Sequence, residues 1–127
     1  DMIKYSFDPM NKIAIEVKKR YPEIPIIVFP RGVGGGYELF SKVEQFTALA
    51  IDSAVPAPWA ASLQHNITVQ GNLDPLLLVS GGKKLKTEVE YLIHHLNNKR
   101  FVFNLGHGIT PDADPNNVSR LVEYVRN

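Results

Sequence analysis

The sequence predicts an α/β fold with a parallel sheet, and three observations carry that prediction. Four short apolar segments recur along the 127 residues. Segments with helical spacing of apolar residues separate them, and each connection is long enough for the crossover that parallel neighbours require. The run at 24–29 is continuously apolar, which is typical of a strand covered on both faces. This alternation predicts βαβ units with right-handed crossovers.

The first helix is expected from Asp8-Pro9 to about Arg20. Asp8 can cap free N–H groups, and Pro9 at the first helical position sacrifices no hydrogen bond. Apolar residues then follow at three- and four-residue spacing on one face: Met10, Ile13, Ala14 and Val17. Tyr21-Pro22 ends this helix, because the residue before a proline avoids helical backbone.

The first strand, 24–29, leads into a glycine-rich loop, 30–36, and then a helix that begins near Tyr37. The second strand, 47–51, ends at Asp52. A short helix at 59–63 precedes the third strand, 67–70.

A leucine run at 76–78 and a break at Gly81-Gly82 come before the strongest helix, 85–97. Its buried stripe is predicted from five positions: Leu85, Val89, Leu92, Ile93 and Leu96. The fourth strand is 101–103, and Asp114-Pro115 begins a last helix with four inward residues: Val118, Leu121, Val122 and Val125.

Composition narrows the class of protein. A chain of 127 residues with 44% hydrophobic residues can bury the core of one domain. Its 14 basic and 13 acidic residues leave a net charge of +1, so the charge balance indicates neither nucleic acid nor an anionic membrane as partner. There is no cysteine, no apolar run of the ~20 residues that span a bilayer, and no signal-peptide pattern. We expect a cytoplasmic protein, and the start at Asp1-Met2 so close to a helix indicates a cut through a longer chain.

Polar residues follow the predicted strands, where parallel α/β folds build their sites. His107 lies between two glycines after the fourth strand, near Asn104, and either imidazole nitrogen could reach a ligand. The alternative is a turn histidine that bonds its own loop. Gln70 and Asn72 provide amide groups at the end of the third strand, where Gly71 would leave room for a ligand.

Other polar residues have alternative roles. Asp74 is expected to cap the following turn, and Asp52 to accept a structural hydrogen bond, since burial would otherwise raise its pKa. Arg31 could bind a carboxylate in bidentate fashion or remain solvated.

The glycine run, three histidines and the tryptophan do not match known patterns of ligand or metal sites. The glycine run has neither the lysine and hydroxyl of a P-loop nor the spacing of a dinucleotide fingerprint, so it is interpreted as a mobile loop. Surface positions are expected for His65, His94 and His95, whose spacing does not indicate metal ligands. Trp59 is interpreted as a core or interface residue.

Two motifs, Gln70-Gly-Asn-Leu-Asp-Pro75 and Phe103-Asn-Leu-Gly-His-Gly-Ile-Thr-Pro111, resemble the C-terminal part of the uroporphyrinogen decarboxylase family. The strand ending in Asp52 and the tail 114–127 also resemble that family. Arg31 and the glycine run lie where many relatives carry lysine and fewer glycines, and Ser53 replaces a common tryptophan.

The resemblance implies that residues 1–127 are the C-terminal half of a TIM (β/α)8 barrel and contain its last four strands. It implies a cofactor-free enzyme that removes CO2 from the four acetate side chains of uroporphyrinogen III to give coproporphyrinogen III in heme biosynthesis. The complete enzyme is expected to be a homodimer.

His107 corresponds to the histidine of the family's motif, which contacts the tetrapyrrole substrate. Arg31, Gln70, Asn72 and Asn104 are further candidates for substrate binding. The resemblance implies that the main pyrrole-binding aspartate and the substrate-binding arginines belong to the missing N-terminal half, so this chain alone is expected to be inactive.

Two alternatives stay open at this point. A related barrel methyltransferase would bind zinc through cysteine and histidine, and the absence of cysteine weakens that alternative. The chain could also be a non-catalytic product of a split gene that retains the motifs.

Overall fold

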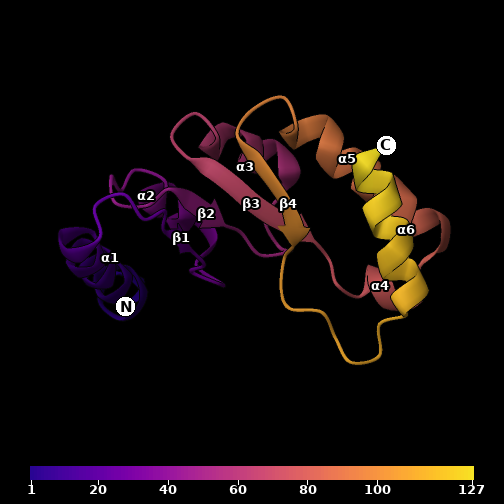
Figure 1. Ribbon diagram of the computed structural model, residues 1–127, viewed down its shortest axis with the longest axis horizontal. Helices are drawn as coiled ribbons and strands as arrows, with labels where there is room; N and C mark the ends of the chain where they lie inside the picture. The colour runs from indigo at the N-terminus through magenta and orange to yellow at the C-terminus, as the bar shows by residue number, and fades with distance from the viewer.

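Four parallel strands lie side by side in chain order in the computed structural model, which describes residues 1–127 (Figure 1). The strands are β1 (Ile27–Val28), β2 (Ala48–Ala50), β3 (Thr68–Leu73) and β4 (Phe101–Leu105). One register row joins Val28, Leu49, Val69 and Phe101 across all four strands. The predicted α/β class, the parallel direction and the strand order are confirmed.

The helical elements alternate with these strands along the chain. They are η1 (Ile3–Phe7), α1 (Asp8–Arg20), η2 (Gly34–Gly36), α2 (Tyr37–Phe40), α3 (Ala57–Leu63), α4 (Leu77–Ser80), α5 (Gly82–Leu96) and α6 (Pro115–Arg126). None of them combines the length and the apolar character needed to cross a membrane.

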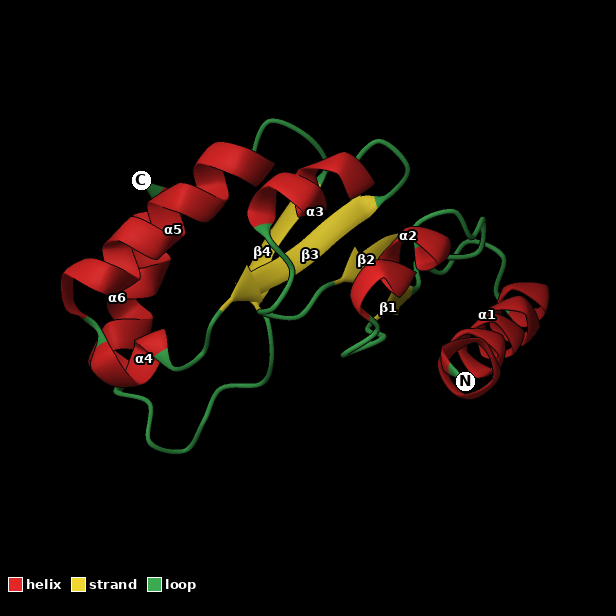
Figure 2. Ribbon diagram, turned by 180° about the vertical axis from the view of Figure 1, so that it is seen from behind, coloured by secondary structure: helices red, strands yellow, loops and turns green.

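The hydrophobic core lies between one face of the sheet and the helices (Figure 2). Leu49 and Val69 point into it and are fully buried, as are Leu85 and Val89 of α5. Neighbouring positions along the strands alternate to the other face of the sheet. There Ile27 is 53% exposed and Val102 is 43% exposed, so the second face of the sheet is open at both edge strands, whereas Ala48 and Ala50 between them are buried.

α1 begins at Asp8, as predicted, but the capping role predicted for Asp8 is wrong. The chain is already helical before Asp8, whose own backbone is helical, and the Asp8 N–H donates to the carbonyl of Ile3 across the π-helical turn η1. Pro9 has no N–H, so a helix that continues through it loses a hydrogen bond. The wider turn accommodates that loss, and Asp8 becomes an ordinary first-turn residue of α1.

The buried face of α1 is narrower than predicted. Ala14 is its only fully buried residue, whereas Ile13 is 64% exposed. In both ribbon views α1 lies at the end of the sheet beyond β1 rather than across its face (Figures 1 and 2). The helix therefore contacts the rest of the chain along a thin stripe.

Several element boundaries also differ from the prediction. β1 begins later than predicted, because Pro25 cannot donate to a sheet ladder and the Ile26 N–H donates to the Thr47 hydroxyl. β3 and β4 extend to Leu73 and Leu105, which pair with each other. The last three residues of the glycine-rich loop form the 3-10 turn η2, which runs directly into α2.

Candidate functional site

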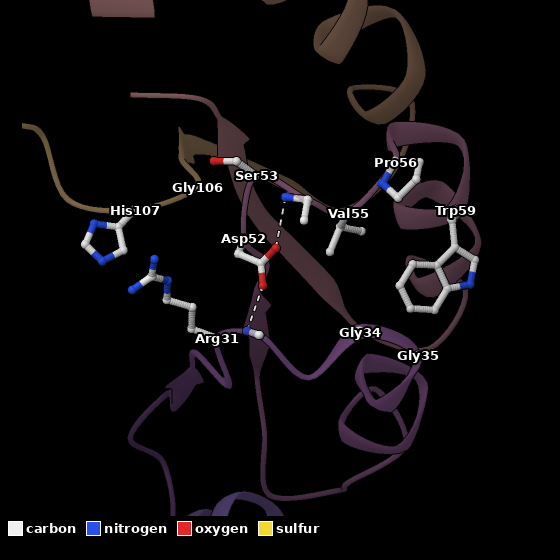
Figure 3. A pocket seen from close by; sticks show the side chains of 12 residues that line it. Arg31, Gly34, Gly35, Asp52, Ser53, Val55, Pro56, Trp59, Gly106 and His107 are labelled. Atoms are coloured by element: carbon white, nitrogen blue, oxygen red, sulfur yellow. Dashed lines mark hydrogen bonds between the residues drawn. The ribbon is translucent and has the colours of Figure 1, made fainter. Parts of the chain in front are cut away.

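A cleft of about 720 Å3 opens at the carboxyl edge of the sheet, where the loops after β1, β2 and β4 meet (Figure 3). Arg31 follows β1, Asp52 follows β2 and His107 follows β4. These residues are far apart in sequence, and the parallel direction of the strands brings them to one edge. The remaining wall comes from the loop 53–56 and Trp59.

Asp52 holds the loops around the cleft through both carboxylate oxygens. Its Oδ2 accepts hydrogen bonds from the Gly32 N–H at 2.8 Å and from the Tyr37 hydroxyl at 2.7 Å. Its Oδ1 accepts from the Ala54 N–H at 2.9 Å. The predicted structural role of Asp52 is therefore confirmed.

These hydrogen bonds also set the charge of Asp52. Burial alone would raise the pKa of its carboxyl group, but the donors from Gly32, Tyr37 and Ala54, helped by the charge of Arg31, lower that pKa overall. Asp52 is thus an anion at neutral pH, with most of its lone pairs already engaged inside the protein.

Arg31 and His107 form the polar end of the cleft. Figure 3 shows the guanidinium and the imidazole next to each other at the same side of the cleft. Both side chains are exposed, and neither makes a side-chain hydrogen bond or an ion pair within the chain. Donor groups of this kind suit a carboxylate, which a guanidinium can bind through two parallel hydrogen bonds.

The opposite end of the cleft is apolar. Val55, Pro56 and the indole of Trp59 line it, and Figure 3 places Trp59 across the cleft from Arg31. Trp59 is partly buried against the core, as predicted, but it also faces the cleft. The cleft therefore offers donors at one end and an apolar wall at the other.

Gln70 and Asn72 lie outside this cleft. Gln70 pairs with Ala50 and Val102 in the middle of the sheet, before the strand end at which it was predicted. Asn72 is buried, and its amide donates to the carbonyls of Asp52 and Val55 at 2.8 Å each. It lines a second hollow of about 330 Å3 behind the loop 53–56.

Asn104 also lies elsewhere. Its side chain is exposed and accepts a hydrogen bond from the N–H of the next residue, Leu105, at 2.8 Å. It borders a hollow against α6, away from Arg31 and His107. Of the five proposed binding residues, the fold brings only Arg31 and His107 together.

Gly71 of β3 and Gly106 after β4 allow close contact with the chain at the end of β2. A Cβ on Gly71 would stand 2.8 Å from the carbonyl oxygen of Ile51, so this glycine serves close strand packing rather than the predicted ligand space. A Cβ on Gly106 would collide with the backbone and side chain of Ser53. The β4 loop therefore crosses the end of β3 and brings His107 to the β2 side.

The remaining polar predictions have simple outcomes. Asp74 accepts from the Leu76 N–H and Asp114 from the Asn116 N–H, as turn and helix caps. Of the three histidines for which surface positions were expected, His65 and His94 are exposed and His95 is half-buried.

Ser53, Trp59 and Tyr37 were not identified as site residues from the sequence. Ser53 directly follows Asp52 after the second strand, so its position alone could have indicated the cleft. Tyr37 offers no such signal, because only the folded chain brings it beneath Asp52.

The parallel βα units and the cleft at their carboxyl edge define the class: part of an α/β protein of the kind that binds ligands at its strand ends. A family model described as uroporphyrinogen decarboxylase (URO-D) matches residues 1–127. Proteins named uroporphyrinogen decarboxylase are similar to the chain, with 43% identity over 127 residues in Paracoccus denitrificans and 48% over 124 residues in a Jannaschia species. A protein of the same name from Rickettsia bellii is 40% identical over 123 residues.

The chain belongs to the uroporphyrinogen decarboxylase family. The matches cover 97–99% of this chain but only 36–37% of the length of those relatives. Because the family fold is a TIM barrel, the four strands are a part of such a barrel.

Proposed function

We propose that this chain supplies part of the active site of a uroporphyrinogen decarboxylase, in which residues 1–127 are the C-terminal half of the barrel. The observation that carries this proposal is the pairing of Arg31 and His107 at one end of the cleft, both free of partners within the chain. The substrate would be uroporphyrinogen III, whose acetate side chains present carboxylates to such donors.

The proposed reaction replaces each acetate carboxyl group by a proton. A pyrrole protonated on a ring carbon accepts the electron pair of the breaking C–CO2 bond, which leaves an exocyclic methylene group. The methylene carbon then takes up a proton to become the methyl group, and the ring carbon releases the first proton, so that one proton is consumed for each CO2 released. The pyrrole itself acts as the electron sink, so the proposal includes no cofactor. A protein that catalyses this reaction must hold the anionic side chains in place while the pyrrole is protonated.

The residues of the cleft fit these tasks. The Arg31 guanidinium would hold a carboxylate of the substrate, and His107 would stabilise or position the reacting side chain with its imidazole N–H. Val55 and Trp59 offer apolar surface to the pyrrole rings. Asp52 would act indirectly, because its oxygens are already engaged in fixing the surrounding loops.

The complete enzyme is proposed to be a cytoplasmic homodimer. That part of the proposal rests on the family resemblance. The pyrrole-binding aspartate and further arginines are proposed to come from the part of the barrel outside these 127 residues.

A chimera tests the proposal. Residues 1–127 would replace the matching segment of the Paracoccus denitrificans relative, with which they share 43% identity. We expect the purified chimera to convert uroporphyrinogen III into coproporphyrinogen III. A folded chimera that binds no tetrapyrrole and forms no product would contradict the proposed function and favour the split-gene alternative.

A further inference from the structure

Tyr37 is a fully buried residue beneath the cleft, and it does not line the cleft itself. Its hydroxyl donates to Asp52 Oδ2 at 2.7 Å and accepts from the Asp52 N–H at 3.1 Å. Its ring meets the Trp59 ring edge to face, with 6.5 Å between centroids. Tyr37 therefore contacts Asp52, which bonds the loop that carries Arg31, and Trp59, which lines the apolar end of the cleft.

The polar contact continues to Arg31. Asp52 Oδ2, which accepts from Tyr37, also accepts from the backbone N–H of Gly32 at 2.8 Å (Figure 3). Gly32 comes directly after Arg31. The side chain of Arg31 has no hydrogen-bond or ion-pair partner in the chain. The position from which the guanidinium reaches into the cleft thus depends on the hydrogen bond between Gly32 and Asp52.

Packing alone does not account for the hydroxyl of Tyr37. Phe40, one turn further along the chain, is equally buried and carries no polar atom. A phenylalanine at position 37 would keep the ring contact with Trp59. Burial and the hydrogen bond to Asp52 raise the pKa of the Tyr37 hydroxyl well above its usual value, so it remains a donor to the Asp52 carboxylate.

We propose that Tyr37 is a positioning residue for the substrate cleft: it fixes Arg31 through Asp52 and Gly32, and it supports Trp59 by direct ring contact. One buried side chain thereby sets the separation between the donor end and the apolar end of the cleft. This inference rests on the proposed function, because its consequence is how a substrate carboxylate and its pyrrole are held together.

The test is a double-mutant cycle in the chimera, with Tyr37→Phe, Arg31→Gln and the combination. Tyr37→Phe should raise KM for uroporphyrinogen III roughly fivefold with kcat within about twofold, because a lost binding interaction raises KM alone. If Tyr37 acts through Arg31, adding Tyr37→Phe to the Arg31→Gln chimera should change KM by less than about twofold. Tyr21→Phe removes the hydroxyl of an exposed tyrosine and should leave both constants unchanged.

Additive effects of Tyr37→Phe and Arg31→Gln on KM would overturn the inference, and so would an unchanged KM in Tyr37→Phe. An equal loss of kcat in every variant with Tyr37→Phe, together with a lowered melting temperature, would show a structural role only. If the unchanged chimera forms no coproporphyrinogen, the proposed function fails first, and the positioning role falls with it.

Discussion

His107 lies at the polar end of the cleft with an exposed side chain and no hydrogen bond to the rest of the chain. In the chimera, His107→Ala should lower kcat/KM roughly 10- to 100-fold, the size expected when a hydrogen bond to a charged group is lost. The free energy of unfolding should change by less than about 0.5 kcal/mol, since no packing is removed.

Steady-state kinetics and thermal unfolding of the same preparations check this expectation. His94→Ala, on the exposed side of α5, serves as control and should affect neither quantity. A large drop in melting temperature with normal turnover would support the alternative of a turn histidine.

Asp52 should make stability depend on pH. Its pKa in the folded chain is lowered, so its stabilising contribution is complete above the unfolded value of about 3.9 and is lost as the pH falls through the folded value. Asp52→Asn should lose about 1–3 kcal/mol at pH 7, because an amide cannot accept from all three donors. Its stability should also fall less than that of the parent between pH 4 and pH 2.

Urea unfolding at a series of pH values measures this difference. Asp112→Asn, which replaces an exposed carboxylate without a hydrogen bond, should preserve the parent's pH dependence. Identical pH profiles for the parent and Asp52→Asn would refute the role assigned to the Asp52 hydrogen bonds.

The candidate site could be predicted only in part from the sequence. Arg31 and His107 follow apolar strands directly, so the rule for parallel sheets brings them to one edge. The same rule failed for Asn72 and Asn104, because it gives the level of a residue in the sheet but not the direction of its side chain. Tyr37 depends on a contact over 15 positions, which no local pattern indicates.

At the scale of elements, apolar periodicity was sufficient where a segment has one clear buried face. Four of the five residues predicted for the buried stripe of α5 are buried, and Ile93 is partly buried against the core. The four are Leu85, Val89, Leu92 and Leu96. Apolar periodicity was insufficient for α1, where Ile13 remains exposed. The spacing of apolar residues does not indicate how wide a surface the helix packs against. The strand ends differ from the predicted ends at two kinds of position. Pro25 cannot take part in the ladder of β1, and Leu73 extends β3 because it pairs with Leu105 of β4.

Two neighbouring glycines allow a matched test of the loop after β4. A methyl group at Gly106 would collide with Ser53, whereas one at Gly108 would meet no atom within 4 Å. Gly106→Ala should therefore destabilise the chain by about 1–3 kcal/mol and reduce turnover of the chimera, because it pushes His107 away from the cleft.

Gly108→Ala is the control and should be nearly neutral for both properties. Chemical unfolding and steady-state kinetics of the two variants measure the contrast. Equal effects of the two substitutions would mean that the loop does not depend on its contact with Ser53.

At the scale of the whole molecule, the sheet is covered on one side only. Ile27, Phe29 and Val102 are large apolar residues at 53%, 38% and 43% exposure. The edge strands β1 and β4 each have one neighbour, so both present unpaired backbone groups. An open apolar face and free strand edges favour association with another chain.

Residues 1–127 expressed alone should therefore form concentration-dependent oligomers and show no decarboxylase activity. The double variant Ile27→Thr/Val102→Thr keeps β-branched side chains on the open face but makes them more polar, and it should shift the chain toward monomer. Val122 of α6, for which the predicted inward position is wrong, has a similar exposure of 41%, and Val122→Thr should leave association unchanged. Sedimentation velocity over a range of concentrations distinguishes these cases. A monomeric parent with measurable coproporphyrinogen formation would show that the open face needs no partner and that the residues of this chain suffice for the chemistry.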